Sequence, residues 1–233
     1  MKSVFWLMFI CFSSCKEHHP SRTMVSKQIS KSPETIVHKE SYVECRNNIS
    51  QLRKLLKNKY PVATNNIEAL QKEFVSVLAD SIFSYWYGTA WDFNGATQEP
   101  GKGHIACGYF VTTVLEDAGV ALQRVKLAQC ASQKIIDNLI SFNPKKVFSN
   151  VPCEKFLEYI KQQGYGIYIV GLDFHVGFLY NDGTNIYFIH AKWVHPKAVV
   201  KEVAIASSPL YYSHYRIVGK LSDDRQFLKR WLQ

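Results

Sequence analysis

The periodicity of the apolar residues changes from helical to strand-like near Gly164, and this change limits the possible folds more than any other feature. Before it, residues 49–56 and 67–82 space apolar side chains three or four apart, as in amphipathic helices. After it come runs rich in Ile, Val, Tyr and Phe, at residues 165–171, 174–180 and 185–192. Asn181-Asp182-Gly183 joins the last two as a hairpin. The order predicts an α+β fold, with N-terminal helices packed on an antiparallel β-sheet.

Breaker residues divide the rest of the chain into shorter elements. Pro61 ends the first helix, Asn65 or Asn66 caps the second, and Gly88 stops it. A loop rich in Gly, Pro and Asn then runs over residues 89–104, before a buried helix that Gly119 closes. Further helices are expected at residues 105–118, 126–140, 153–162 and 223–232, and further strands at 198–205 and 214–220.

The first fifteen residues have the order of an export signal. Met1-Lys2 is followed by a nine-residue apolar run at 4–12, too short to span a bilayer, and then by Ser13-Ser14-Cys15. Small residues directly before a Cys resemble the lipobox of bacterial lipoproteins, in which that Cys is acylated. We therefore expect a lipoprotein-type signal peptide at 1–14, a lipid anchor on Cys15, and export to the bacterial cell envelope facing the periplasm or cell surface. An ordinary cleaved signal is the alternative.

A basic, polar segment follows the leader. Residues 16–60 hold ten Lys or Arg against four Glu, which is most of the formal net charge of +9. Residues 15–43 are rich in Ser, Lys, Glu and Pro, and we expect a flexible tether leading to one domain at 44–233. Its positive charge is compatible with a solvated tether, and also with binding to anionic lipid or to anionic wall polymer. Nucleic acid is not an expected partner, because no basic cluster is interleaved with aromatics. A monomer is expected.

Four cysteines lie beyond the leader: Cys45, Cys107, Cys130 and Cys153. They show no CxxC spacing, so a zinc or thioredoxin-like site is not favoured, and no metal or cofactor is expected. Export permits disulfides, and the sequence leaves open whether any pair forms.

Cys107 begins an apolar helix directly after the glycine-rich loop. Free N–H groups and the helix dipole at such a position favour a thiolate, and the same groups can stabilise an oxyanion. Cys107 is therefore a candidate nucleophile. The alternative is a small buried apolar residue.

Two histidines flank the predicted hairpin. His175 begins one strand and His190 ends the other, so both lie near the same open end of the pair. One imidazole can take the thiol proton while the other orients it. Two strand histidines without a shared role are the alternative.

Four segments together resemble the NlpC-type cysteine peptidases of the bacterial cell wall. They are GTAWDFNG (88–95), ACGYFV (106–111), HVGFLYNDG (175–183) and FIHA (188–191). The resemblance implies a papain-like fold with Cys107 as nucleophile, His175 as base and His190 as the orienting residue. It departs from the family at Ala106, where Asp is usual, and at Trp91, where Tyr is usual.

The neighbours of these motifs are the expected substrate-binding residues: Trp91, Asp92, His104 and Gly108. The stretch 123–163 is longer than the family usually has, and is interpreted as a lid, a substrate-selecting insertion or packing. The function implied is a thiol hydrolase, without metal, that cleaves amide bonds in peptidoglycan stem peptides. Two alternatives stay open: a papain-like acyltransferase acting on lipid, and a catalytically silent envelope-binding lipoprotein.

Overall fold

The computed structural model describes residues 40–60, 67–141 and 144–233. All the described residues belong to one compact unit, Ile36–Gln233. The expected signal peptide, the anchor at Cys15, most of the expected tether and the cap at Asn65 or Asn66 lie outside the described residues.

Long helices form most of the first half. The helix α1 (Tyr42–Lys59) begins two residues before the expected domain boundary, because Ser41 and Glu44 form a capping box there. The helix α2 (Ile67–Ser76) continues through a π-helical turn, η1 (Val77–Ile82), into α3 (Phe83–Trp86). The chain then turns at Gly88, whose φ of 84° favours glycine. These helices confirm the helical pattern read from the sequence.

Shorter helices complete the helical part. They are α4 (Cys107–Asp117), α5 (Arg124–Ala128), α6 (Ser132–Leu139), α7 (Cys153–Gln162), α8 (Ser208–Tyr211) and α9 (Arg225–Leu232), with 3-10 turns η2 (Ala204–Ala206) and η3 (Leu221–Asp223). The prediction of one helix over 126–140 is wrong. The segment bends because α5 packs against α4 while α6 packs on the sheet, where Ser132 Oγ donates to the Leu172 carbonyl.

Six strands form one sheet in the order β1-β6-β2-β3-β4-β5, and all its neighbouring pairs are antiparallel. They are β1 (Lys146–Ser149), β2 (Gly166–Leu172), β3 (Val176–Asn181), β4 (Ile186–Ala191), β5 (Val199–Val203) and β6 (Tyr215–Lys220). The edge strand β1 was not expected. Only Phe148 of its four residues is buried, so it carries no apolar alternation. The predicted α+β class is confirmed.

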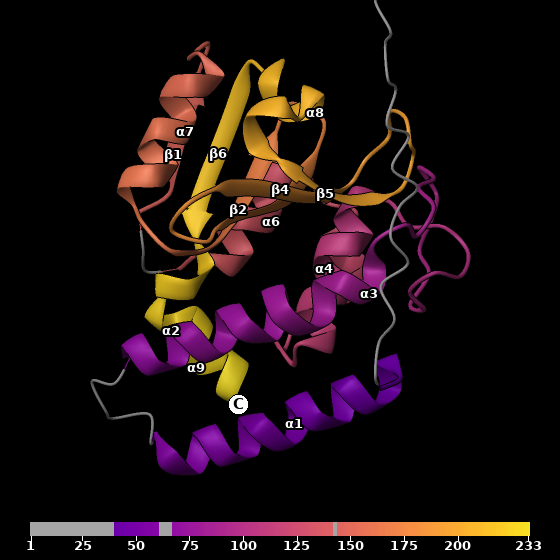
Figure 1. The fold of residues 1–233 in the computed structure, drawn as a ribbon, viewed down its shortest axis with the longest axis vertical. Helices are drawn as coiled ribbons and strands as arrows, with labels where there is room; N and C mark the ends of the chain where they lie inside the picture. Colours follow the sequence, from indigo (N-terminus) through magenta and orange to yellow (C-terminus); the bar gives the residue numbers. More distant parts are fainter. Residues whose placement is uncertain (1–39, 61–66, 142–143) are drawn as a thin grey trace, which may run out of the picture. The chain divides into compact units, whose positions relative to one another are not determined.

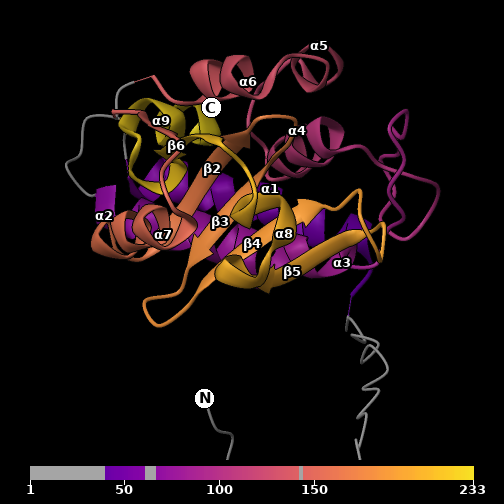
Figure 2. The same cartoon turned by 90° about the horizontal axis from the view of Figure 1, so that it is seen from above.

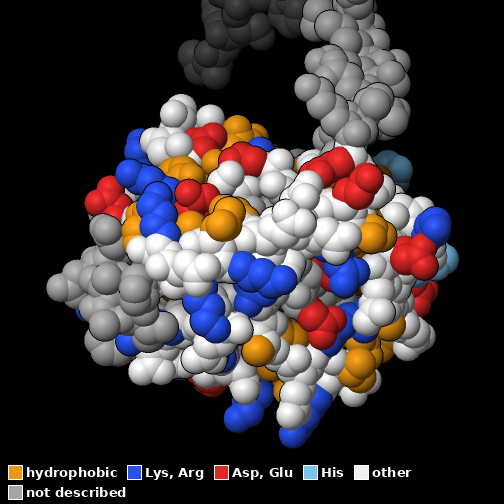
Figure 3. Space-filling view, turned by 90° about the horizontal axis from the view of Figure 1, so that it is seen from below, with side chains coloured by type: hydrophobic (Ala, Val, Ile, Leu, Met, Phe, Trp, Pro, Cys, Tyr) orange, Lys and Arg blue, Asp and Glu red, His pale blue; other side chains and the backbone are white. Residues whose placement is uncertain are grey.

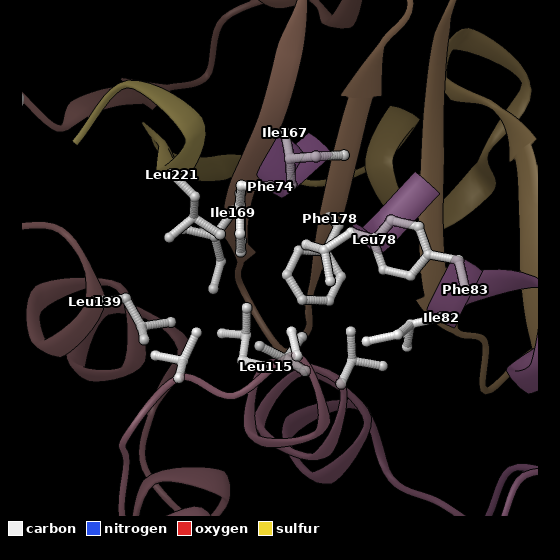
Figure 4. Close-up of a cluster of buried hydrophobic side chains, with 14 of the residues drawn as sticks. Phe74, Leu78, Ile82, Phe83, Leu115, Leu139, Ile167, Ile169, Phe178 and Leu221 are labelled. Carbon is white, nitrogen blue, oxygen red and sulfur yellow. The ribbon is translucent and has the colours of Figure 1, made fainter. Parts of the chain in front are cut away.

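Helices lie on both faces of the sheet (Figures 1 and 2), and the sheet separates two hydrophobic clusters. The larger lies under α1 to α6 and α9, with Phe74, Leu78, Ile169 and Phe178 at its centre (Figure 4). The smaller lies under α7 and α8 on the other face, around Phe188. Alternate residues of β2, β3 and β4 supply the two clusters, as the two-residue period of a strand requires.

The surface seen from below intersperses basic and acidic side chains (Figure 3). Within the described ranges, no helix has the length and apolarity needed to cross a membrane.

Candidate active site

Cys107 is the first residue of α4, after Ala106 in extended conformation. The first backbone bond of this helix runs from the Phe110 N–H to the Ala106 carbonyl, at 2.8 Å. The N–H groups of Cys107, Gly108 and Tyr109 therefore have no partner within the helix. Those of Cys107 and Gly108 lie beside the thiol, and unpaired N–H groups at a helix tip are suited to a developing oxyanion.

The loop before α4 is held by close backbone contacts. The Ala106 N–H donates to the Gly95 carbonyl at 2.8 Å, and a Cβ on Gly95 would lie 2.5 Å from the carbonyl carbon of His104. The Trp91 N–H donates to the Lys197 carbonyl at 2.8 Å. These contacts fix the position of Trp91 beside the helix tip and explain the glycine that ends the first motif.

The two predicted histidines meet. Nε2 of His175 lies 2.7 Å from Nδ1 of His190, and both rings are buried. His190 stacks on Phe188, with ring centroids 4.1 Å apart. A Cβ on Gly177 would approach the Cβ of His190 to 2.8 Å and the Phe188 ring to 2.7 Å. The glycine after His-Val thus makes room for the second histidine.

A carboxylate and an amine extend this pair. Nε2 of His190 lies 3.0 Å from Oε1 of Glu202, and Oε2 of Glu202 lies 2.6 Å from Nζ of Lys192. Glu202 stands on β5, beside β4. The sequence analysis missed both residues. A signal for Glu202 existed, because it lies in a predicted strand at the edge of the histidine hairpin.

The ionised carboxylate of Glu202 determines which ring nitrogen carries the proton in His190 and in His175. Burial by itself raises the pKa of Glu202, but hydrogen bonds from His190 and Lys192 outweigh burial and lower it to about 2. An ionised Glu202 accepts the Nε2–H of His190, so Nδ1 of His190 is an acceptor. His175 must then donate its Nε2–H to His190, which leaves Nδ1 of His175 unprotonated. The hydrogen-bond pattern therefore leaves Nδ1 of His175 able to accept a proton.

Burial sets the charge of the resting groups. It holds the pKa of His175 well below the usual range, and the neighbouring His190 adds to this effect. Burial also lowers the pKa of His190, although Glu202 acts in the opposite direction. The pKa of the Cys107 thiol is raised by burial, which outweighs the backbone N–H groups of Val176, Gly108 and Cys107. The expectation of a lowered thiol pKa is therefore wrong, and the resting pair is a neutral thiol and a neutral imidazole.

A cleft of about 690 Å³, which we call the thiol cleft, contains Cys107 and His175. Five of its thirteen lining residues are Phe, Trp or Tyr. The full lining is Trp91, Phe93, Asn94, Ala106, Cys107, Gly108, Tyr109, Ala128, Gln129, Cys130, Phe174, His175 and Trp193. Among these described residues none is Lys, Arg, Asp or Glu. Its volume is in the range of small-molecule sites.

The expected substrate-binding residues divide into two pairs. Trp91 and Gly108 line the thiol cleft. The absent Cβ of Gly108 leaves space for the Ala128 carbonyl, which would lie 2.2 Å from it. Asp92 and His104 are exposed and do not belong to the lining. The Asp92 carboxylate instead accepts the Asn94 N–H at 2.8 Å.

The 123–163 stretch has two roles in the structure. Its first part lines the thiol cleft through Ala128, Gln129 and Cys130. Farther along this stretch, α6 and α7 pack on the sheet and β1 joins the sheet as its edge strand beside β6. The buried Arg124 connects this stretch to the loop before α4, since its guanidinium donates to Thr113 Oγ1 and to the Ala96 carbonyl, each at 2.7 Å. The same guanidinium lies 5.0 Å from the centre of the Tyr109 ring.

Cys45, Cys107, Cys130 and Cys153 are all free thiols. In the described part of the chain, no group of three His, Cys, Asp or Glu is placed to hold a metal ion. Comparisons of the chain with protein-family models, curated proteins and solved structures find no match. The case for a function therefore rests on the geometry of the site.

Proposed function

We propose that the protein is a papain-like cysteine hydrolase that cleaves amide bonds, with Cys107 as nucleophile, His175 as base and His190 as the residue that orients the base. The observation that carries this proposal is the hydrogen-bonded chain from His175 through His190 to Glu202, beside a thiol in the same cleft. A nucleophile, a base and an orienting group are the parts that covalent catalysis needs.

The reaction starts from neutral groups. Nδ1 of His175 takes the thiol proton as the Cys107 sulfur attacks the carbonyl, and the N–H groups at the tip of α4 bind the oxyanion. The imidazolium then protonates the leaving amine, and the C–N bond breaks. Water hydrolyses the resulting thioester and regenerates the thiol. The negative charge of Glu202 favours the transient imidazolium through His190.

The substrate that the motifs imply is a peptidoglycan stem peptide, reached from a lipid anchor in the cell envelope. Digestion of purified muropeptides followed by mass analysis tests this substrate, with Cys107→Ala as the matched inactive variant. We expect fragments only with the wild type. Equal fragment release by Cys107→Ala would overturn the mechanism.

A specific observation favours a second substrate class, the acyl groups of lipids. Stem peptides carry free carboxylates and amines, whereas the thiol cleft is rich in aromatic side chains and has no described Lys, Arg, Asp or Glu in its walls. An assay with a lipid acyl donor that shows consumption of donor, without wall cleavage, would select this class. Binding without turnover of either substrate would instead select the silent envelope-binding lipoprotein.

A further inference from the structure

A second hollow of about 480 Å³ is also lined by His175. We call it the apolar hollow. It shares Phe174, His175 and Trp193 with the thiol cleft, and the rings of His175 and Trp193 are 4.7 Å apart. The rest of its lining is Leu172, Asp173, Val194, Ser208, Pro209, Tyr212, Ser213 and His214. A substrate group that enters it is therefore within reach of the reacting centre.

The one acidic residue in the described lining of the apolar hollow, Asp173, already has hydrogen-bond partners within the protein. The Asp173 carboxylate accepts hydrogen bonds from Ser213 Oγ at 2.7 Å and from the backbone N–H groups of His214 and Tyr215 at 2.8 and 3.1 Å. No Lys or Arg is among the described lining residues. A charged substrate group would therefore find no Lys, Arg, Asp or Glu side chain here that is free to pair with it. Losing its hydration in the hollow would cost free energy that no ion pair offsets. An uncharged, apolar group fits the hollow.

The rim of the apolar hollow exposes aromatic surface to water. Phe174 is 93% exposed and Tyr212 is 75% exposed. The backbone of Phe174 is fixed in a two-residue turn, which the Leu172 N–H closes by donating to the His175 carbonyl at 2.8 Å. Both rings belong to the lining of the same hollow, so the exposed apolar surface borders a cavity that a ligand can enter. The turn places the aromatic ring directly before the proposed base.

We propose that the apolar hollow is an acyl subsite, which takes the hydrocarbon chain of a linear acyl amide while the acyl carbonyl reaches Cys107. This inference rests on the proposed thiol chemistry and develops the second substrate class, the acyl groups of lipids. The Cys107 sulfur forms a thioester with the acyl carbon, the C–N bond breaks, and His175 carries the thiol proton to the amine. Water then releases the free fatty acid and the thiol.

The test compares chain lengths on p-nitroanilides of acetic, butyric and octanoic acid. Each buried methylene contributes roughly fourfold in binding, so kcat/KM of the wild type should rise at least tenfold from acetyl to octanoyl. The ratio of kcat/KM for the octanoyl substrate to kcat/KM for the acetyl substrate should fall to within about twofold of 1 in Tyr212→Asp. Tyr212→Phe should keep the wild-type ratio. The control Val147→Asp changes an exposed apolar residue outside both cavities and should also keep the ratio.

A binding measurement separates the subsite from the reaction. Calorimetry of Cys107→Ala with octanamide and with acetamide should give at least tenfold tighter binding of octanamide, and adding Tyr212→Asp should remove the difference. Chain-length-dependent binding without any turnover by the wild type would keep the subsite and overturn the proposed reaction. Turnover with equal kcat/KM for all three anilides would overturn the subsite alone. Equal binding of the two amides would also overturn the subsite.

Discussion

Nε2 of His190 lies 3.0 Å from Oε1 of Glu202, and this contact decides which nitrogen of the neighbouring His175 is free to accept a proton. Lys192 holds the other carboxylate oxygen at 2.6 Å. The hydrogen-bonded contacts run from Glu202 on β5 through His190 on β4 to His175, directly before β3, so the β-sheet itself orients the proposed base. Glu202 touches no reacting atom in this arrangement and acts as a positioning residue.

Glu202→Gln removes the charge that fixes both tautomers. We expect kcat/KM to fall at least about tenfold, because misorientation of a general base forfeits part of its contribution of roughly 10²- to 10⁴-fold. The acid limb of the pH–rate profile should also move, which a purely structural role would not cause. Glu158→Gln, which alters an exposed ion pair on α7, is the matched control. An unchanged profile and rate for Glu202→Gln would contradict the positioning role.

Gly177→Ala introduces a methyl group where His190 and Phe188 leave no space. We expect a loss of about 1–3 kcal/mol in the free energy of unfolding, as for other overpacked sites, together with lower activity. Urea denaturation and steady-state kinetics check the two effects. Lys201→Ala, on β5, serves as a control in the same sheet. A variant as stable and active as the wild type would show that the packing is looser than described.

Arg124→Leu removes the donors that hold the Ala96 carbonyl and Thr113 Oγ1. The loss of buried charged hydrogen bonds should lower stability by about 1–3 kcal/mol. It should also raise KM, because the loop that carries Trp91 loses its connection to α5. The exposed Lys126 on the same helix provides the control Lys126→Leu. Equal effects of the two substitutions would mean that the Arg124 contacts are unimportant.

The lowered pKa of His175 makes stability depend on pH. Between the ordinary histidine pKa of about 6.5 and the lower folded value, the unfolded chain binds a proton that the folded chain does not. Stability should therefore fall as the pH falls below about 6.5. Urea denaturation at pH 7.5 and 5.5 should show a larger loss for the wild type than for His175→Asn. Equal losses would place the titration elsewhere.

Glu202 adds a second acidic transition. Its pKa is lowered to about 2 in the folded state, from an ordinary value of 4.5. Its contribution to stability is present above pH 4.5 and is lost as the pH falls from there toward 2. The free energies of unfolding of the wild type and Glu202→Gln, measured against pH, should therefore converge as the pH falls through this interval. A constant difference between the two proteins over this pH interval would contradict the pairing of Glu202 with His190 and Lys192.

The sequence predicted the parts of the site that local patterns encode. The helix at Cys107, the hairpin at Asn181-Asp182-Gly183 and the resulting meeting of His175 with His190 follow from turn residues and two-residue alternation. The rest depends on tertiary contacts. Glu202 reaches His190 only through the register of β4 and β5, and the edge strand β1 carries no apolar alternation of its own.

The thiol pKa of Cys107 differs from the value expected from the sequence for a related reason. A helix N-terminus favours a thiolate, and that feature is visible in the sequence. Burial opposes it and raises the thiol pKa. The residues that line the thiol cleft with Cys107 include His175 and Trp193, which are distant in the chain. The position of the cysteine was predictable, but its electrostatic environment was not.

The nucleophilic role of Cys107 is tested most directly by trapping its acyl intermediate. The wild type, mixed with p-nitrophenyl octanoate and quenched within the first turnover, should gain one octanoyl group by intact mass, and peptide mapping should locate that group on Cys107. His175→Ala should acquire it at least about a hundredfold more slowly. Acylation of Cys107→Ala at the wild-type rate, or an adduct on another residue, would contradict the account.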